Sequence, residues 1–280
     1  MGAPGAYPGS EPHPLGSREA WHYGLASALL FLLVAAMNLD PALGSNEWLY
    51  LLQPRSMADP SFPGWEPSAS GSPTTAFWWL GAGLFLLLDD HLLVAMVGRI
   101  LGWVFVLFAL ARLSRTLGVG PGAFLLGIVF WLLAGQSLMA GEWIFRGFEQ
   151  KVFAYGFLFL AVTALLERKG FLTGLYLGLA ISFHVLVGGW ASLALAVAAL
   201  VGLRELGIRR VLAFVGTAAL VGSPFLYLAL RSQGGDVAPV SPVSAGAPEG
   251  FDALSFIVRF RNPHHLDPGF FFTVKKGVLL

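Results

Sequence analysis

Long apolar runs separated by short polar segments are the feature that most constrains how this chain folds. Of its 280 residues, 56% are hydrophobic and only 12% are charged, whereas a soluble domain carries about a quarter charged residues. Lipid offers no partner to free backbone groups, so runs of this kind cross a membrane as helices. The sequence therefore predicts an all-α, polytopic transmembrane helix bundle. The apolar runs are Tyr23–Met37, Ala76–Leu88, Leu92–Leu113, Ala123–Ala140, Val152–Leu166, Phe171–Leu203 and Val211–Leu230.

Charge placement predicts how these runs cross the membrane, because several are shorter than the about 20 residues of a full span. Short loops rich in Lys and Arg stay cytoplasmic, and clusters of this kind lie around Arg112, Arg168 and Arg204. If all of them are inside, Phe171–Leu203 must form a hairpin of two short helices. The predicted turn is His184–Trp190, because its Gly-Gly pair favours a helix break.

The run Ala76–Leu88 has two possible roles. A single crossing is allowed between the first outer loop (residues 38–91) and Arg112, and Leu92–Leu113 is long enough to provide it. The shorter run then becomes an interfacial helix on the outer face. The alternative makes it a short span and places Arg112 outside, against the charge rule. The favoured topology has about seven spans, with short interfacial helices in the outer loop.

The two ends of the chain are expected outside the bundle. Residues 1–20 are rich in Gly and Pro and are expected to form a disordered cytoplasmic tail. Residues 21–232 form the bundle, and its first run is interpreted as a retained signal anchor. Residues 233–280 follow as an exterior segment. Since seven spans leave the end outside, we expect a fragment or a short version of a longer protein of the cell (inner or plasma) membrane.

This topology gathers acids, bases and cations on the outer face, above all in Gly141–Tyr155 (GEWIFRGFEQKVFAY). An ionisable residue at membrane depth costs several kcal/mol unless it is paired or faces water. The cluster therefore indicates a polar pocket, and the alternative is an ordinary interfacial loop. Such a pocket can hold a phosphorylated, lipid-linked substrate, with Lys and Arg on the phosphate and a carboxylate as general base.

Three carboxylates of the first outer loop are candidates for the general base. Asp59 in RSMADPSF is the first, although an Asp-Pro pair also initiates turns. Glu47 in SNEWLY is the second, with the alternative that it is the first-turn acid of a loop helix. Asp40 in NLDPAL is the third, with the alternative of a turn or cap directly after a span.

The substrate-binding candidates come from several segments of the same face. Glu149 and Lys151 are two residues apart and do not share a helix face, so no direct pair between them is expected. His264 and His265 lack the i, i+4 spacing of a helical zinc pair, so no metal site is assigned, and a divalent metal is kept only as an alternative cofactor. The full set is Arg55, Glu149, Lys151, His184, Arg259, Arg261, His264 and His265.

Several functions are excluded by what the sequence lacks. With no Cys there is no disulfide, thiolate metal site or cysteine nucleophile. A net charge of +1 and no basic patch interleaved with aromatic residues argue against nucleic acid as a partner. No phosphate-binding Gly-rich loop, GxSxG or HExxH motif occurs. Gly174 and Gly178 instead have the small-xxx-small spacing typical of packed membrane helices.

The order of these segments resembles the membrane glycosyltransferases of the GT-C type. SNEWLYLLQPRSMADPSF looks like the first outer loop of that superfamily, and GFEQKVFAYGFLFLA, GLYLGLAISFHVLVGGW and RFRNPHHLDP look like segments of its bacterial multi-pass relatives. The resemblance implies inverting transfer of a sugar from a polyprenyl-phosphate donor. It implies Asp59, Glu47 or Asp40 as base, and Lys151, Arg259 or Arg261 at the phosphate. Such enzymes usually have more spans than this chain supplies.

Two other classes of protein stay open. A transporter or flippase for a lipid-linked or anionic substrate would use the same broken helices and buried charges, although no internal repeat relates the two halves of the sequence. A non-catalytic membrane assembly subunit would use its charged clusters to dock a neighbour. In all three classes, membrane lipid is a partner.

Overall fold

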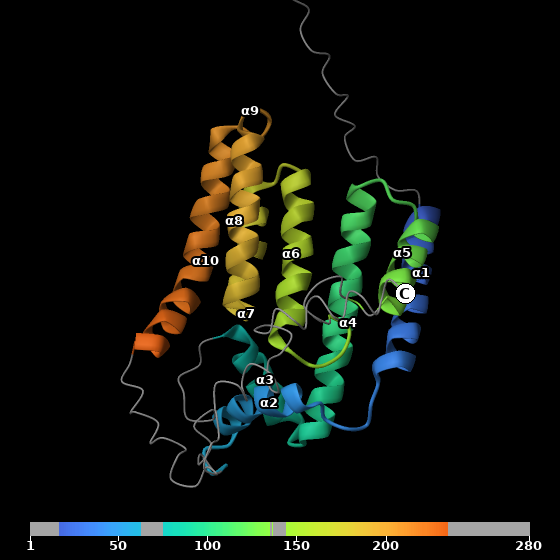
Figure 1. The fold of residues 1–280 in the computed structure, drawn as a ribbon, viewed down its shortest axis with the longest axis vertical. Coiled ribbons are helices and arrows are strands. Elements are labelled where there is room, and N and C mark those ends of the chain that lie inside the picture. Colours follow the sequence, from blue (N-terminus) through green and yellow to red (C-terminus); the bar gives the residue numbers. More distant parts are fainter. Residues whose placement is uncertain (1–16, 63–74, 135, 137–143, 235–280) are drawn as a thin grey trace, which may run out of the picture.

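The described part of the chain, residues 17–62, 75–134, 136 and 144–234, is helical and has no β-strand in this computed structural model. Figure 1 shows most of the helices running side by side as a bundle. The helices are α1 (Ser17–Asn38), α2 (Ser45–Ala58), α3 (Ala76–Leu88), α4 (His91–Thr116), α5 (Pro121–Leu133), α6 (Gln150–Leu166), α7 (Gly170–Phe183), α8 (Val185–Val201), α9 (Leu203–Leu206) and α10 (Ile208–Gly234).

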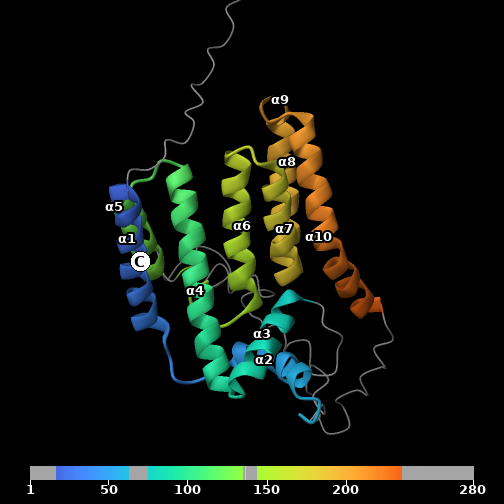
Figure 2. The ribbon, with the colours of Figure 1, turned by 180° about the vertical axis from the view of Figure 1, so that it is seen from behind.

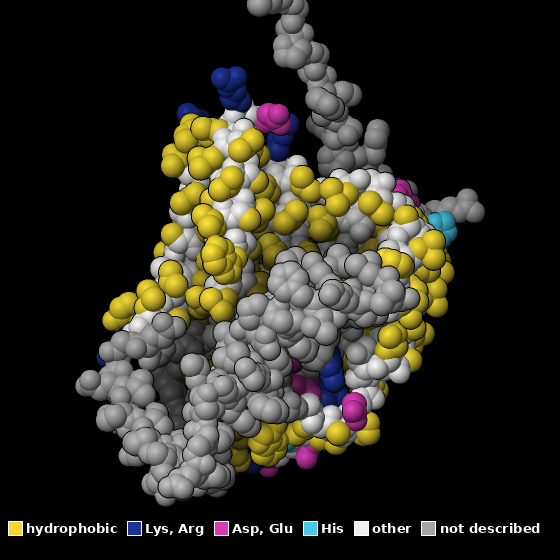
Figure 3. Space-filling view, viewed as in Figure 1, with side chains coloured by type: hydrophobic (Ala, Val, Ile, Leu, Met, Phe, Trp, Pro, Cys, Tyr) yellow, Lys and Arg dark blue, Asp and Glu magenta, His cyan; other side chains and the backbone are white. Residues whose placement is uncertain are grey.

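The bundle has two chemically different ends. Helices α2 and α3 lie together at one end, where α4 and α6 begin, and we call it the polar end (Figures 1 and 2). At the opposite end lie α9 and the links from α4 to α5 and from α6 to α7, and we call it the basic end because it carries Arg112, Arg115, Arg168, Lys169 and Arg204. In Figure 3, hydrophobic side chains cover the sides of the bundle and Lys and Arg gather beside α9.

Three helices are long and apolar enough to cross a membrane: Glu19–Asn38 of α1, His91–Thr116 of α4 and Ile208–Arg231 of α10. Five more apolar helices, α3, α5, α6, α7 and α8, are shorter. Large side chains such as Phe130 and Leu220 are 74% and 76% exposed on the outside of the bundle, which is typical of a surface that contacts lipid. The predicted all-α fold and membrane association are confirmed to this extent.

Helices α2 and α3 pack against each other in the predicted outer loop. Tyr50 of α2 contacts Phe77 of α3 edge-on with ring centroids 6.4 Å apart. Pro54 of α2 lies against Gly81 of α3, where a Cβ added to the glycine would be 2.8 Å from the proline ring. Because both helices lie at the polar end, the link from α3 to α4 begins there too, as the interfacial interpretation of Ala76–Leu88 requires (Figure 2).

The hairpin predicted within Phe171–Leu203 is confirmed, but its turn differs from the prediction. Helix α7 ends at Phe183, His184 takes an extended conformation, and α8 begins at Val185. The Gly-Gly pair lies inside α8 and does not break it. Gly188 is needed for close packing instead, since a Cβ there would lie 2.3 Å from the backbone nitrogen of Ile181 in α7.

Two helix boundaries also differ from the prediction. Helix α1 begins at Ser17, within the expected tail, and residues 1–16 lie outside the described residues. Helix α5 ends at Leu133, short of the predicted Ala140. Gln136 adopts a left-handed φ of 61°, and its side-chain oxygen accepts hydrogen bonds from the backbone N–H groups of Ile144 and Phe145. These bonds tie the end of α5 to the chain before α6.

Close packing of α7 on α10 confirms the small-xxx-small interpretation. A Cβ on Gly174 would lie 2.3 Å from the carbonyl oxygen of Phe214, and one on Gly178 would lie 2.6 Å from Cβ of Val221. The hydroxyl of Ser182 on the same face reaches the carbonyl oxygen of Val221 at 3.5 Å. Glycine is therefore required here so that the two helix backbones can approach each other.

Replacing Gly174 with Ala is expected to destabilise the bundle, because the methyl group forces α7 away from α10. Overpacking of this kind costs about 1–3 kcal/mol, which a lower Tm in thermal unfolding of the detergent-purified protein would report. Gly216 of α10 offers a matched control, since a Cβ there meets nothing within 4 Å. Gly216→Ala should leave the Tm unchanged or raise it. A Gly174→Ala protein as stable as the wild type would contradict the packing.

Candidate functional site

A buried ion pair between Arg99 of α4 and Glu47 of α2 forms the centre of the polar end. The two side chains are each 3% exposed. Arg99 donates from Nε to Glu47 Oε1 at 2.7 Å and from Nη2 to Oε2. This two-pronged contact is the strongest geometry available to an arginine and a carboxylate.

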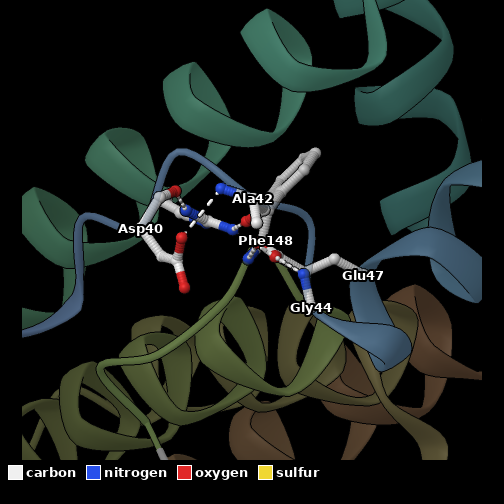
Figure 4. Close-up of polar contacts among 6 residues, drawn as sticks. Asp40, Ala42, Gly44, Glu47 and Phe148 are labelled. Atoms are coloured by element: carbon white, nitrogen blue, oxygen red, sulfur yellow. Dashed lines mark hydrogen bonds and ion pairs between the residues drawn. The ribbon is translucent and has the colours of Figure 1, made fainter.

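Both partners of this pair have further hydrogen bonds to the backbone. Arg99 donates to the carbonyl oxygens of Asp40 at 2.5 Å and Ala42 at 2.8 Å. Glu47 accepts from the backbone N–H groups of Gly44 at 2.9 Å and Phe148 at 2.6 Å. Figure 4 shows Gly44 and Phe148 beside Glu47, with Asp40 and Ala42 in the same loop as Gly44. The pair therefore joins the first loop, α4 and the chain before α6.

These hydrogen bonds determine the charge of Glu47. Burial alone would raise the pKa of this carboxyl group, but the hydrogen bonds from Arg99, Phe148 and Gly44 outweigh it and hold the pKa below its ordinary value of 4.5. Glu47 is thus an ionised carboxylate with its oxygens engaged. Glu47 lies in the first turn of α2 and forms a capping box with Gly44. This agrees with the alternative interpretation of Glu47 as the first-turn acid of a helix in the loop.

The segment before α6 is packed tightly onto this centre. A Cβ on Gly147 would lie 2.9 Å from Cγ of Glu47, and one on Gly98 of α4 would lie 2.2 Å from the ring of Phe148. The Phe148 side chain is fully buried, and its ring is tilted against that of Phe77 of α3 with the centroids 4.7 Å apart. The polar end is therefore a packed unit of α2, α3, α4 and residues 144–149.

A second cluster lies on the outer side of the same unit and is centred on Arg55 of α2. Its guanidinium group donates to Asp59 at 3.4 Å and to the carboxylate of Asp89 at the end of α3. It also lies over the rings of Phe85 and Phe62, at 5.4 and 5.9 Å from their centroids. Arg55 thus brings together two carboxylates that are 30 residues apart in sequence.

Asp59 is partly exposed to solvent, and hydrogen bonds from neighbouring groups favour its charged form. Its side chain is 36% exposed and follows the last residue of α2. The hydroxyl and the backbone N–H of Ser61 donate to it at 2.6 and 2.9 Å. Together with Arg55, these bonds lower the pKa of Asp59. The Asp-Pro turn predicted as an alternative is therefore present, and it positions the carboxylate.

His91 adds an aromatic wall to this cluster. Its ring lies 4.9 Å from Phe85, 5.2 Å from Trp48 and 6.0 Å from Phe62. Its Nε2 is buried and has no hydrogen-bond partner among the residues that the structure describes. The preceding Asp90 caps α4 by accepting from the backbone N–H of Leu93 at 2.8 Å, which fixes where His91 lies.

Glu149 and Lys151 form an ion pair of 3.1 Å, so the prediction that they would not pair was wrong. Glu149 is the N-cap of α6 and has extended backbone, not helical backbone. The rule for side chains on a helix face therefore does not apply to Glu149, and its carboxylate can reach Lys151 in the first turn of α6. Both side chains are largely buried, at 6% and 15% exposed.

The remaining predicted residues are dispersed. The carboxylate of Asp40 accepts from the backbone N–H of Ala42 at 2.8 Å, as a turn residue after α1 does. His184 accepts from the backbone N–H of Val187 through Nδ1 at 3.2 Å and so caps α8. Within the described ranges, no group of three or more His, Asp or Glu side chains could hold a metal ion. Arg259, Arg261, His264 and His265 lie outside the described residues.

The residue that sequence reasoning missed is Arg99. It is the one charge within the long apolar run Leu92–Leu113 before Arg112, and an arginine in such a run needs a partner inside the protein. That signal identifies Arg99 as a structural centre. It does not identify Glu47 as the partner, because six acidic residues of the first outer loop are available to it.

No family model, no curated protein and no solved structure matches this chain. The candidate site therefore rests on its geometry, a packed polar end that presents Arg55, Asp59, Asp89 and His91 beside aromatic rings.

Removing one partner of the buried pair is expected to destabilise the fold strongly. Arg99→Met leaves the Glu47 carboxylate buried and unpaired, which costs about 3–5 kcal/mol, measured as a lower free energy of unfolding. Arg112→Met is a matched control, since Arg112 is 37% exposed and 3.4 Å from Glu167. It should cost only about 0–1 kcal/mol.

Acid supplies an independent test of the same pair. Because folding lowers the pKa of Glu47, its contribution to stability is present above pH 4.5 and is lost as the pH falls through the folded value. The wild type should lose more stability below pH 4.5 than Arg99→Met, in which the carboxylate has no cation. An equal loss in both proteins would contradict the assignment.

Proposed function

We propose that this protein is a membrane-embedded, glycosyltransferase-like enzyme that transfers a sugar from a polyprenyl-phosphate donor at the outer face of the membrane. The polar end is the proposed reaction site. The observation that carries the proposal is the Asp59 carboxylate, which is partly exposed, held ionised by Ser61, and placed beside the Arg55 cation.

In the proposed step Asp59 acts as the general base. It takes the proton of an acceptor hydroxyl while that oxygen attacks the anomeric carbon of the sugar. The bond from the anomeric carbon to the phosphate oxygen breaks, and polyprenyl phosphate leaves with the electron pair. Attack opposite the leaving group inverts the anomeric centre, and a positioned base of this kind contributes about 10²–10⁴-fold in rate.

Asp59 is preferred over the other two candidate bases because of what those groups already contact. Both oxygens of Glu47 are engaged by Arg99 and backbone N–H groups, and the side chain is buried. Asp40 is exposed and its carboxylate closes a turn by accepting from the N–H of Ala42. The cation near it, Arg99, is already bound by Glu47. We propose that Glu47 holds the site together and that Asp59 does the chemistry.

The aromatic wall supports a sugar as the substrate. Trp48, Phe62 and Phe85 line the side of the cluster on which His91 lies. The Trp48 ring is 46% exposed, and a flat exposed ring suits the apolar face of a sugar. Arg55 is the nearest described cation for the donor phosphate, and Lys151, Arg259 and Arg261 are proposed as further phosphate ligands.

The opposite charges of the two ends support the proposed orientation. The basic end collects the Lys and Arg residues that favour the cytoplasmic side, and α1 begins there, with Tyr23 under Arg115 at 6.0 Å. We therefore propose a cytoplasmic N-terminus, about seven spans, a location in the cell membrane, and α2 and α3 as interfacial helices on the outer face.

Asp59→Asn is expected to abolish the reaction while leaving the fold intact. Membranes carrying the protein would be supplied with polyprenyl-phosphate hexose and pentose, and release of polyprenyl phosphate would be measured. The amide keeps the shape and can still accept from Ser61, but it cannot take a proton. We expect a loss of about 10²-fold or more, with an unchanged Tm.

Asp40→Asn is the matched control and should retain wild-type release. Equal activity in Asp59→Asn and the wild type would overturn the assignment of the base. Donor turnover that stops in Asp40→Asn but continues in Asp59→Asn would move the base to Asp40. A wild type that consumes neither donor would contradict the enzyme proposal itself.

A further inference from the structure

A groove of about 990 Å³ lies between α1 and α4, away from the polar end. Its walls are mainly apolar and come from two helices that are each long enough to span a membrane. Leu32, Val104 and Phe108 on its rim are 63%, 52% and 55% exposed, so the groove opens on the outer side of the bundle, where lipid lies. The apolar lining includes Gly24, Ala28, Phe31, Val104, Phe108 and Ala111.

The groove is kept open by small side chains of α1. Gly24, Ser27 and Ala28 form its floor on that helix. A Cβ added at Gly24 would meet nothing within 4 Å, so glycine here is not required by a neighbouring backbone. A larger residue at this position would fill the groove without a clash.

One end of the groove carries positive charge. Arg112, Arg115, Thr116 and Glu167 line it at the basic end of the bundle. Glu167 is shared, because Lys169 contacts it at 2.6 Å while Arg112 is 3.4 Å away. Arg115 has no carboxylate partner in the part of the chain that the structure describes. The end of the groove therefore has cationic groups left for an anion.

The length of the groove matches one leaflet of a bilayer. Its lining runs over residues 20–32 of α1 and 104–116 of α4, and each stretch is about 18 Å long at 1.5 Å per residue. Half of a hydrocarbon core is roughly 15 Å thick. The arginines thus lie where the headgroup region begins, and the apolar part lies at the depth of the acyl chains.

We propose that this groove binds an anionic phospholipid of the leaflet at the basic end, with an acyl chain between α1 and α4 and the headgroup phosphate on Arg112 and Arg115. Basic pockets between membrane helices on this side are suited to anionic headgroups. The site lies at the opposite end from Asp59 and does not depend on the proposed reaction.

The experiment uses the full chain in nanodiscs of phosphatidylcholine with a minor share of phosphatidylglycerol. The lipids that stay bound after transfer to detergent would be counted by native mass spectrometry. Gly24→Phe should remove the tightly bound phosphatidylglycerol, because the ring occupies the groove. Each arginine contributes about fivefold in affinity, so Arg112→Gln with Arg115→Gln should lower the preference for phosphatidylglycerol by about thirtyfold.

Arg209→Gln with Arg210→Gln is the matched control, since both residues lie at the basic end but not in the groove. It should leave the preference unchanged, and an equal fall in the control would overturn the site. Retained lipid in Gly24→Phe would also overturn it. Displacement of the lipid by inorganic phosphate would show a phosphate site without a lipid-binding groove. Lipid that binds only after removal of residues 1–16 would show that the chain itself fills the groove.

Discussion

The buried contact between Arg99 and Glu47 is the constraint on which the polar end depends. A charged pair away from water is tolerated only when its geometry is good and its remaining polar atoms are satisfied, and both conditions hold here. The backbone groups that satisfy it belong to Asp40, Ala42, Gly44 and Phe148. Segments far apart in the sequence must therefore meet at this point, and they determine where α2 and α3 lie.

Helix α2 connects a carboxylate with a structural role to the one proposed to react. Glu47 is buried and fully bonded, whereas Asp59, at the other end of the same helix, is ionised and reaches solvent. A site held on packed elements keeps its groups in fixed positions, and the link through Arg55 to Asp89 ties α3 into it. The proposed reaction site and the proposed lipid groove then lie at opposite ends of one bundle.

The hydrophobic pattern, together with the placement of charges, predicted the helical fold and several of its helices. The run Ala76–Leu88 matches α3 to the residue, and the need for a hairpin in Phe171–Leu203 followed from its length. The position of the turn could not be predicted, because Gly188 serves a contact with another helix that only the fold creates. In the site, Asp59 stood out by its place in a loop. The pairing of Arg99 with Glu47 depends on how the loop before α2, helix α4 and the chain before α6 come together. A local sequence pattern cannot predict that arrangement.

The most direct test of this account is the sidedness of its two ends. The chain contains no Cys, so single cysteines can be placed at the exposed positions Asp40 and Asp89 of the polar end and Arg168 and Glu205 of the basic end. A membrane-impermeant maleimide added to intact cells should label the first two, and the second two only after permeabilisation. Labelling of the cysteines at positions 40 and 89 from different sides of the membrane would contradict the account. Labelling of those at positions 89 and 205 from the same side would also contradict it.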